Sequence, residues 1–141
     1  MPDIGITGGA IARRIAGCGH DLRVCGLEDA KPAPFLAMRA NAAETAADAA
    51  KGADFVITRL NSVAIVRTAV FGERGAAACM APQSLRLDMS SIDRRSARPL
   101  GAVLRARCGA GWEDAPLSGR APMAQRGQLT VMAGGTSDSA R

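Results

Sequence analysis

At 141 residues the chain is long enough for one domain with one buried core. Because it is 48% hydrophobic but only 3% aromatic, that core must consist of Ala, Val, Ile, Leu and Met, which favours an α/β or α protein over a sandwich of aromatic-rich strands. The net charge of +5 comes from arginines scattered along the chain, and without a basic stripe or interleaved aromatics we predict no nucleic-acid binding.

Segments with strand and helix patterns alternate along the sequence. In chain order we expect a strand at 3–7, a helix at 10–16, a strand at 21–25, a helix at 45–52, a strand at 53–60, a helix at 62–72, a strand at 84–91, a helix at 93–107, and short strands within 111–120 and 128–135. Gly8 and Gly9 predict a turn into the first helix. Thr45 and Asp48 form a variant of the capping box before the second helix.

This order of elements predicts a doubly wound, mostly parallel, Rossmann-like sheet in an α/β protein, formed by a single domain over residues 1–141. The run over residues 53–60 is almost continuously apolar, as expected for a parallel strand covered on both faces. In such sheets ligands bind beyond the carboxyl ends of the strands. We therefore expect one crevice, lined by the strand-end residues 8–9, 26–28, 60–61, 90–91 and 118–119.

The cysteines are too widely spaced for a CxxC motif, and His20 is the single histidine, so we predict no metal site. We expect free, mostly buried thiols at Cys18, Cys25, Cys79 and Cys108. Charged residues interrupt every apolar run before it reaches the roughly 18 residues of a membrane span, and residues 1–6 lack the features of a secretory signal. These observations predict a cytoplasmic protein without a membrane partner.

Several motifs carry a family resemblance. DAPLSG at residues 114–119 is followed by GQLTVMAGG at 127–135, and HDLRVCGLED, GADFVITRLNSVAIVRTAVFGERG and LDMSSIDRRSAR precede them. In this order they resemble the amino-terminal domain of the β-hydroxyacid dehydrogenases, whose motifs are DAPVSGG and GTLTIMVGG. The resemblance covers essentially the whole chain. It implies a nicotinamide-dependent oxidoreductase that uses NAD or NADP and acts on a small β-hydroxy acid or its semialdehyde.

The resemblance also implies roles for residues at the strand ends. Ser118 and Gly119 would hold the carboxylate and hydroxyl of the substrate, and Ser91 would approach the nicotinamide ribose. Leu60 would lie along the cofactor through its backbone. Arg120 stands where the family has glycine, and it either adds a cation for an acidic substrate or blocks the pocket.

The glycine fingerprint at the start of the chain departs from the pattern G-x-G-x-x-G. Read from Gly8, its second position is Ala10, whose Cβ would face the pyrophosphate, and its third is met by Ala12 only if one residue is missing. The helix after it is expected to be cut to two turns, so we predict weakened cofactor binding. Glu28 is either a ribose-binding acid or a solvated turn residue. The predicted cofactor-binding residues are Gly8, Gly9, Ala10, Ile11, Ala12, Gly26, Leu27, Glu28, Leu60, Asn61 and Ser91.

In the family, a lysine of an all-helical second domain moves the hydroxyl proton during hydride transfer, and general acid–base catalysis requires such a partner within reach. Lys31 and Lys51 are the two lysines of this chain, and neither matches that position. We therefore predict no catalytic residue, and weak or no turnover by this chain alone. The alternative is a non-catalytic nucleotide-binding or interaction module. Without the second domain we expect an uncovered apolar face that favours a homo-oligomer.

Overall fold

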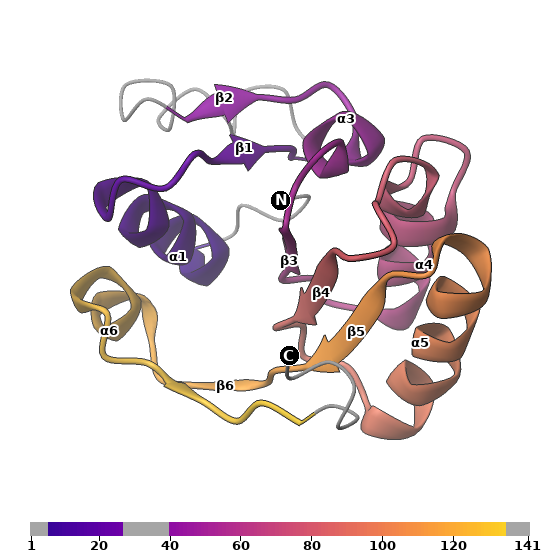
Figure 1. Ribbon diagram of the computed structural model, residues 1–141. Coiled ribbons are helices and arrows are strands. Elements are labelled where there is room, and N and C mark those ends of the chain that lie inside the picture. Colours follow the sequence, from indigo (N-terminus) through magenta and orange to yellow (C-terminus); the bar gives the residue numbers. More distant parts are fainter. Residues whose placement is uncertain (1–5, 27–39, 135–141) are drawn as a thin grey trace.

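The computed structural model describes residues 6–26 and 40–134 (Figure 1). In chain order its elements are α1 (Ile6–Gly17), β1 (Arg23–Val24), β2 (Asn41–Ala42), α3 (Ala46–Ala50), β3 (Phe55–Thr58), α4 (Val63–Phe71), the 3-10 helix η1 (Ala76–Ala78), β4 (Leu85–Asp88), α5 (Arg94–Cys108), β5 (Gly111–Asp114), β6 (Leu117–Ser118), α6 (Ala121–Arg126) and β7 (Thr130–Val131). Within the described part of the chain, no helix combines the length and apolar character that a membrane crossing requires.

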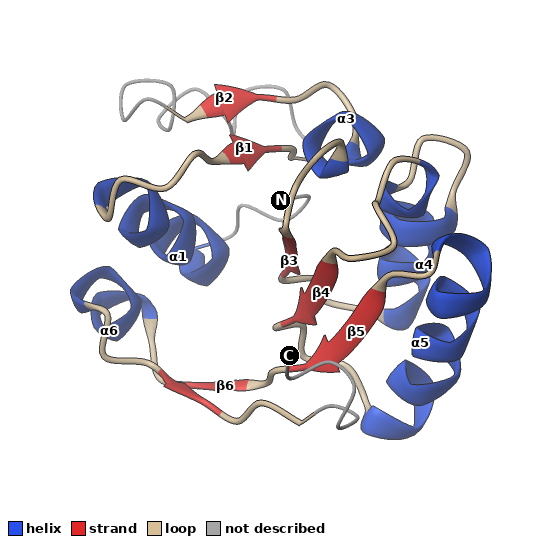
Figure 2. Cartoon of the chain, viewed as in Figure 1, coloured by secondary structure: helices blue, strands red, loops and turns tan. Residues whose placement is uncertain are grey.

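The strands form a mostly parallel sheet system, as the alternating pattern predicts. β3, β4 and β5 make a three-stranded parallel sheet in the order β3-β4-β5, and β1 and β2 make a separate parallel pair. β6 and β7 form an antiparallel pair that extends from the end of β5 (Figure 2). The predicted α/β class with a doubly wound arrangement is confirmed, with one antiparallel addition.

Helices cover both faces of the three-stranded sheet. α4 and α5 lie together on one side, and α1 and α6 lie together on the other (Figure 1). The α4/α5 side holds the largest cluster of buried apolar residues, which includes Val66, Val70, Leu100 and Leu104. On the other side α1 packs through Ala12 against Val24 and the partly buried Ile57. This arrangement leaves the carboxyl ends of the strands free of covering helices, as in other open α/β sheets.

The start of the chain differs from the prediction. Ile6 and Thr7 belong to α1, so the expected strand is wrong for these two residues, while residues 3–5 lie outside the described part. The expected turn at Gly8 and Gly9 is also wrong, because both glycines lie in the first turn of α1. The helix has 12 residues, which is more than the two turns expected.

Tertiary packing explains why α1 continues through its glycines. Ala10 and Ile11 are buried against α6, and Ala12 is buried against β1. Burial of this face stabilises the helix. The gain offsets the destabilisation by Gly8 and Gly9, because each glycine costs about 1 kcal/mol relative to alanine. The predicted end of the helix is confirmed, since α1 stops at Gly17 and Gly19 has a φ of 84°.

The other predicted helices are confirmed, with α3, α4 and α5 falling inside or close to the expected ranges. Thr45 caps α3 and Ser62 caps α4, while Asp93 occupies the N-cap of α5 without a side-chain hydrogen bond. β2, η1 and α6 were not predicted. They are short, and their residues carry no periodic pattern that distinguishes them from loops.

Candidate functional site

The site is built on the junction between the ends of β3 and β4. The backbone N–H of Leu60 donates to Oγ of Ser90 at 2.9 Å, and the N–H of Ser91 donates to the carbonyl oxygen of Leu60 at 3.3 Å. Leu60 and Ser90 are buried, whereas Asn61 and Ser91 are exposed next to them. The structure therefore brings together the predicted strand-end groups 60–61 and 90–91. Each group has one exposed polar side chain, Asn61 and Ser91 respectively.

A buried polar row lies directly beneath this junction. Thr58, Asp88 and Asp114 are the last residues of three neighbouring strands and stand in register. Oδ1 of Asp88 accepts hydrogen bonds from Oγ1 of Thr58 and from the N–H of Ser90, both at 3.1 Å. Thr58 and Asp88 are almost completely buried. Asp88 thus ties the row to the backbone of the Ser90 loop.

Arg86 supplies the positive charge within this row. Its Nη2 lies 3.2 Å from Oδ2 of Asp88 and donates a hydrogen bond to Oγ1 of Thr58, and its guanidinium lies 3.6 Å from the ring centroid of Trp112. Burial lowers the pKa of Arg86 to about 10, and the neighbouring Asp88 and Asp114 act in the opposite direction. The guanidinium therefore remains charged at neutral pH.

The sequence analysis did not identify this charge network. A charged residue inside an otherwise apolar strand is the signal that would have found it, because Arg and Asp are seldom fully buried unless they are paired. Arg86 and Asp88 alternate with Leu85 and Leu87, so both charges face the same side of β4. Nε and Nη1 of Arg86 and Nε1 of Trp112 are buried without a hydrogen-bond partner among the described atoms.

A hollow of about 540 Å³ lies at the carboxyl end of β1. Cys25 and Gly26 form one wall, α3 contributes Ala46, and α4 contributes Ile65 and Thr68. α4, which lines this hollow, begins at Val63 and therefore lies close in sequence to Leu60 and Asn61. Gly26 is the predicted cofactor residue that borders it, whereas Leu27 and Glu28 lie outside the described part.

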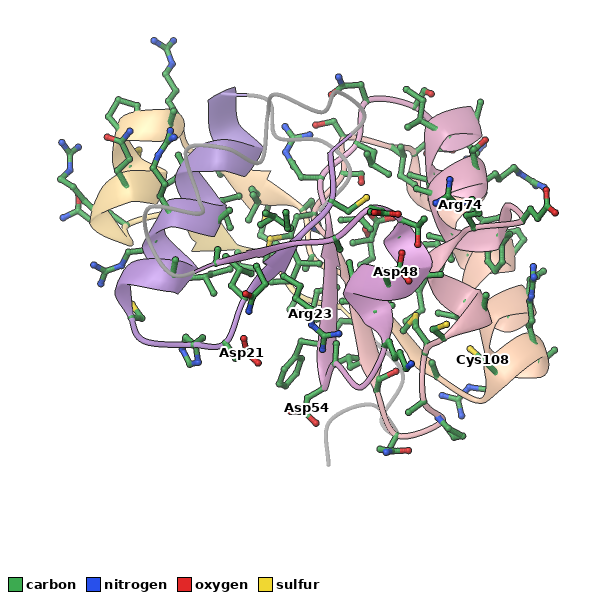
Figure 3. All side chains as sticks on the ribbon, turned by 90° about the horizontal axis from the view of Figure 1, so that it is seen from above. Asp21, Arg23, Asp48, Asp54, Arg74 and Cys108 are labelled. Atoms are coloured by element: carbon green, nitrogen blue, oxygen red, sulfur yellow. The ribbon has the colours of Figure 1, made fainter. Side chains whose placement is uncertain are left out.

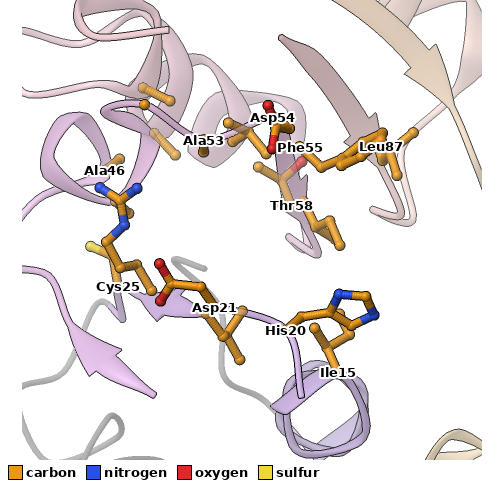
Figure 4. Close-up of a pocket in the computed structure, with 18 residues that line it drawn as sticks. Ile15, His20, Asp21, Cys25, Ala46, Ala53, Asp54, Phe55, Thr58 and Leu87 are labelled. Carbon is orange, nitrogen blue, oxygen red and sulfur yellow. The ribbon is translucent and has the colours of Figure 1, made fainter. Parts of the chain in front are cut away.

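A second hollow, of about 490 Å³, separates β1 from β3 and is mainly apolar (Figure 4). Its charged rim lies at the amino ends of these strands, where Asp21 and Asp54 stand at the same edge of the molecule (Figure 3). Phe55 at the start of β3 is 62% exposed, so the expectation of a strand covered on both faces is wrong at this end. Open α/β sheets bind ligands at the opposite, carboxyl edge, so we do not place the cofactor here.

The remaining residues of the predicted glycine turn have packing roles. Ala10 and Ala12 are fully buried and Ile11 is 7% exposed, so their side chains belong to the core and do not line a surface. Ala10 and Ile11 share a cluster with Ala124 of α6 and, partly buried, Met89 and Leu117. Cofactor binding through these residues stays a prediction.

The predicted substrate residues lie on β6 and at the start of α6. Ser118 is exposed and pairs with Thr130, and exposed Arg120 occupies the N-cap of α6. Gly119 has a φ of 130°, and a Cβ placed there would lie 2.7 Å from Cδ2 of Leu129, so this position requires glycine. Met89 and Leu117 pack in one cluster, which connects the Ser90 loop to the Ser118 strand.

The cysteines differ in part from the expectation. All four are free, but Cys18 and Cys79 are exposed, Cys108 is intermediate and Cys25 alone is buried. The prediction of mostly buried thiols is therefore wrong. Cys18 follows the last residue of α1 and Cys79 follows η1, and the ends of surface helices face solvent regardless of residue type.

A parallel sheet with helices on both faces, hydrogen-bonded strand ends and a hollow at the carboxyl end of β1 is typical of a Rossmann-like dinucleotide-binding domain. The profile of the NAD-binding domain of 6-phosphogluconate dehydrogenase matches residues 4–141. The chain belongs to this family.

Proteins with similar sequences and structures agree with this assignment. The chain is 35% identical over 136 residues to the NAD-dependent L-serine dehydrogenase of Pseudomonas aeruginosa, covering 96% of this chain and 45% of that protein. It is 32% identical over 135 residues to the 3-sulfolactaldehyde reductase of Escherichia coli, with the same shares covered. The crystal structure of 3-hydroxyisobutyrate dehydrogenase from Salmonella typhimurium superimposes with a TM-score of 0.88 at 31% identity, covering 97% of this chain and 47% of that one. The chain thus spans less than half the length of these relatives.

Proposed function

We propose that the chain is the cofactor-binding part of an oxidoreductase that interconverts a small β-hydroxy acid and its semialdehyde. The observation that carries the proposal is the hydrogen-bonded junction of Leu60 and Ser90, which joins two strand ends at the edge where open α/β sheets bind nucleotides. The relatives named above act on serine and sulfolactaldehyde, which are small hydroxy or oxo acids. Their activities favour a substrate of this class.

In this proposal the dinucleotide lies across the carboxyl edge, and when bound it supplies the hydride. Gly26 and the hollow beside it would accommodate the adenosine end. The backbone of Leu60 and the exposed side chains of Asn61 and Ser91 would border the nicotinamide end. Leu27 and Glu28 stay predicted contacts.

Substrate binding is assigned to Ser118, Gly119 and Arg120. Ser118 is exposed, so its hydroxyl can donate to a carboxylate, and Gly119 gives the turn before α6 the positive φ of 130° that favours glycine. Arg120 adds a cation that suits an acidic substrate. We therefore expect an anionic substrate at this loop.

Turnover by this chain alone is expected to be weak. Lys51 is exposed at the C-cap of α3, and Lys31 lies outside the described residues. Neither lysine is at the family's catalytic position, so the proton partner for hydride transfer is not supplied by the residues of this sequence. Following NADH and NADPH oxidation with tartronate semialdehyde tests this expectation, and robust turnover would overturn it.

Binding of NAD and NADP by calorimetry tests the proposed cofactor site. Ala64 is exposed on α4 and borders the hollow beside Gly26, so Ala64→Trp should fill that hollow and weaken dinucleotide binding by about tenfold or more. Ala106 is an exposed alanine of α5 outside both hollows, and Ala106→Trp is the matched control. Equal affinities for the two variants would show that the hollow is not the cofactor site.

The second candidate is a non-catalytic nucleotide-binding or interaction module. The observation that favours it is the placement of Gly8 and Gly9 inside α1, where they do not form the tight turn that cradles a pyrophosphate. Micromolar NAD or NADP binding supports a working cofactor site. Undetectable binding of both nucleotides supports the interaction module.

A further inference from the structure

Burying an arginine destabilises a fold unless other groups compensate for the lost hydration of its charge. Arg86 is fully buried in the middle strand of the three-stranded sheet, and its register partners are Val56 and Trp112, which are apolar or aromatic. Moving a guanidinium out of water costs several kcal/mol, and a close carboxylate with good geometry is needed to offset that cost. The groups that Arg86 contacts must therefore offset the cost of burying its charge.

Two carboxylates explain the need for a cation. Asp88 and Asp114 stand in register on neighbouring strands and face the same side of the sheet, where like charges repel. Asp88 is fully buried, and Arg86 reaches it at 3.2 Å. The cation therefore lies beside the buried carboxyl group that accepts hydrogen bonds from Thr58 and Ser90.

The carboxylate in turn fixes the strand-end loops. Asp88 accepts the N–H of Ser90, and Ser90 accepts the N–H of Leu60. Each backbone group therefore has a buried side-chain acceptor. Asp88 contacts Arg86 directly, and Ser90 is connected to Arg86 through Asp88. Arg86 is fully buried and lines neither of the two hollows described above.

We propose that Arg86 is a positioning residue, which acts through Asp88 to hold the Ser90 and Leu60 backbone in the geometry that the cofactor edge requires. The inference rests on the proposed function only for the statement that a dinucleotide uses this edge. The positioning itself is a property of the free protein. It can be measured without any ligand.

Residue-resolved amide hydrogen exchange tests the positioning. The reference is the amide of Leu85, which donates to the carbonyl oxygen of Asp54 in the same β3–β4 ladder but outside the network. In Arg86→Met, exchange at Leu60 and Ser90 should accelerate about tenfold or more relative to Leu85. The buried Asp88 loses its charged partner, and the loop whose Ser90 accepts the Leu60 N–H is held by Asp88. In Arg86→Lys, which keeps the cation, the ratio should stay within about threefold of the wild type.

A core variant separates positioning from general loss of stability. Leu104 is fully buried in α5, in the apolar cluster against which Trp112 packs, and its side chain takes no part in the hydrogen bonds and ion pair of Arg86, Asp88 and Ser90. Leu104→Ala should accelerate all three amides together and leave the ratio unchanged. Far-UV circular dichroism reports whether each variant is folded, because Arg86 contacts Trp112 and its substitution would change the tryptophan fluorescence directly. An unchanged ratio in folded Arg86→Met would overturn the proposal.

A milder variant keeps the test decisive if Arg86→Met does not fold. Thr58→Val keeps the shape of the side chain but removes the hydroxyl that donates to Asp88 and accepts from Arg86. It should raise the exchange ratio by about threefold or more, and no rise would count against the positioning role. Titrating NAD against Arg86→Lys, Thr58→Val and Leu104→Ala then tests the link to the cofactor. If the wild type binds no dinucleotide, the proposed function fails, whereas the exchange ratio still decides the role of Arg86.

Discussion

At the scale of single residues, Cys25 is a side chain whose ionisation is changed by its position. It is 6% exposed at the end of β1, and burial raises the pKa of its thiol above the ordinary value, with the nearby Asp48 carboxylate acting in the same direction. In the unfolded chain the thiol loses its proton near pH 9, whereas in the folded protein it keeps the proton to higher pH. The unfolded state therefore binds fewer protons above pH 9.

This difference predicts a fall in stability with rising pH. Above about pH 9 the free energy of unfolding of the wild type should fall more steeply than that of Cys25→Ala, by at most about 1.4 kcal/mol per pH unit. Urea denaturation from pH 7 to 10 measures both slopes. Cys79 is exposed, so Cys79→Ala should follow the wild type. Parallel curves for the wild type and Cys25→Ala would contradict the prediction.

The buried pair of Arg86 and Asp88 shows what residue-level patterns leave out. The strand over residues 84–91 could be predicted from its apolar alternation and its hydroxyl-rich end, and the Ser90 and Ser91 positions at the sheet edge followed from it. The pairing of Arg86 with Asp88 and Trp112 depends on how two strands register with each other. A single sequence does not contain that register.

At the scale of elements, helix starts were predictable where a side chain caps the helix. Oγ1 of Thr45 accepts the N–H of Asp48 at 3.0 Å and donates to the Asp48 carboxylate at 2.6 Å. Both residues of the predicted capping box are therefore engaged. α1 was mispredicted because its start is determined by contacts with α6 and β1, which a local motif does not encode.

The cap of α3 gives a prediction for stability. Thr45→Ala removes the acceptor for the Asp48 N–H and should lower the free energy of unfolding by about 1 kcal/mol, as measured by urea denaturation. Thr68 is an exposed threonine inside α4 whose hydroxyl bonds to the carbonyl oxygen of Ala64. Thr68→Ala is the matched control, and it should change stability by less than about 0.5 kcal/mol. If the two variants were equally stable, the cap would not contribute.

At the scale of the whole molecule, apolar side chains remain uncovered at one end. Met123, Val131 and Met132 are between 36% and 54% exposed, and they come from α6 and from β7 and the residue after it. β7 pairs only with β6 among the described strands, so one of its edges is unpaired there. An apolar strand with an unpaired edge favours association with another chain. The alternation of strands and helices predicted the sheet, but neither this antiparallel extension nor its exposure follows from that pattern.

We expect this apolar end to promote self-association in solution. Light scattering after size-exclusion chromatography should show a molar mass that rises with protein concentration, and Val131→Lys should shift the protein towards the monomer by placing a desolvated charge in the contact. Val103 is a matched control because it is 49% exposed, close to the 47% of Val131, but lies on α5 at the other side of the sheet (Figure 1). Val103→Lys should behave as the wild type does. A monomer at every concentration, or equal effects of the two lysines, would show that the contact does not lie at the β7 end.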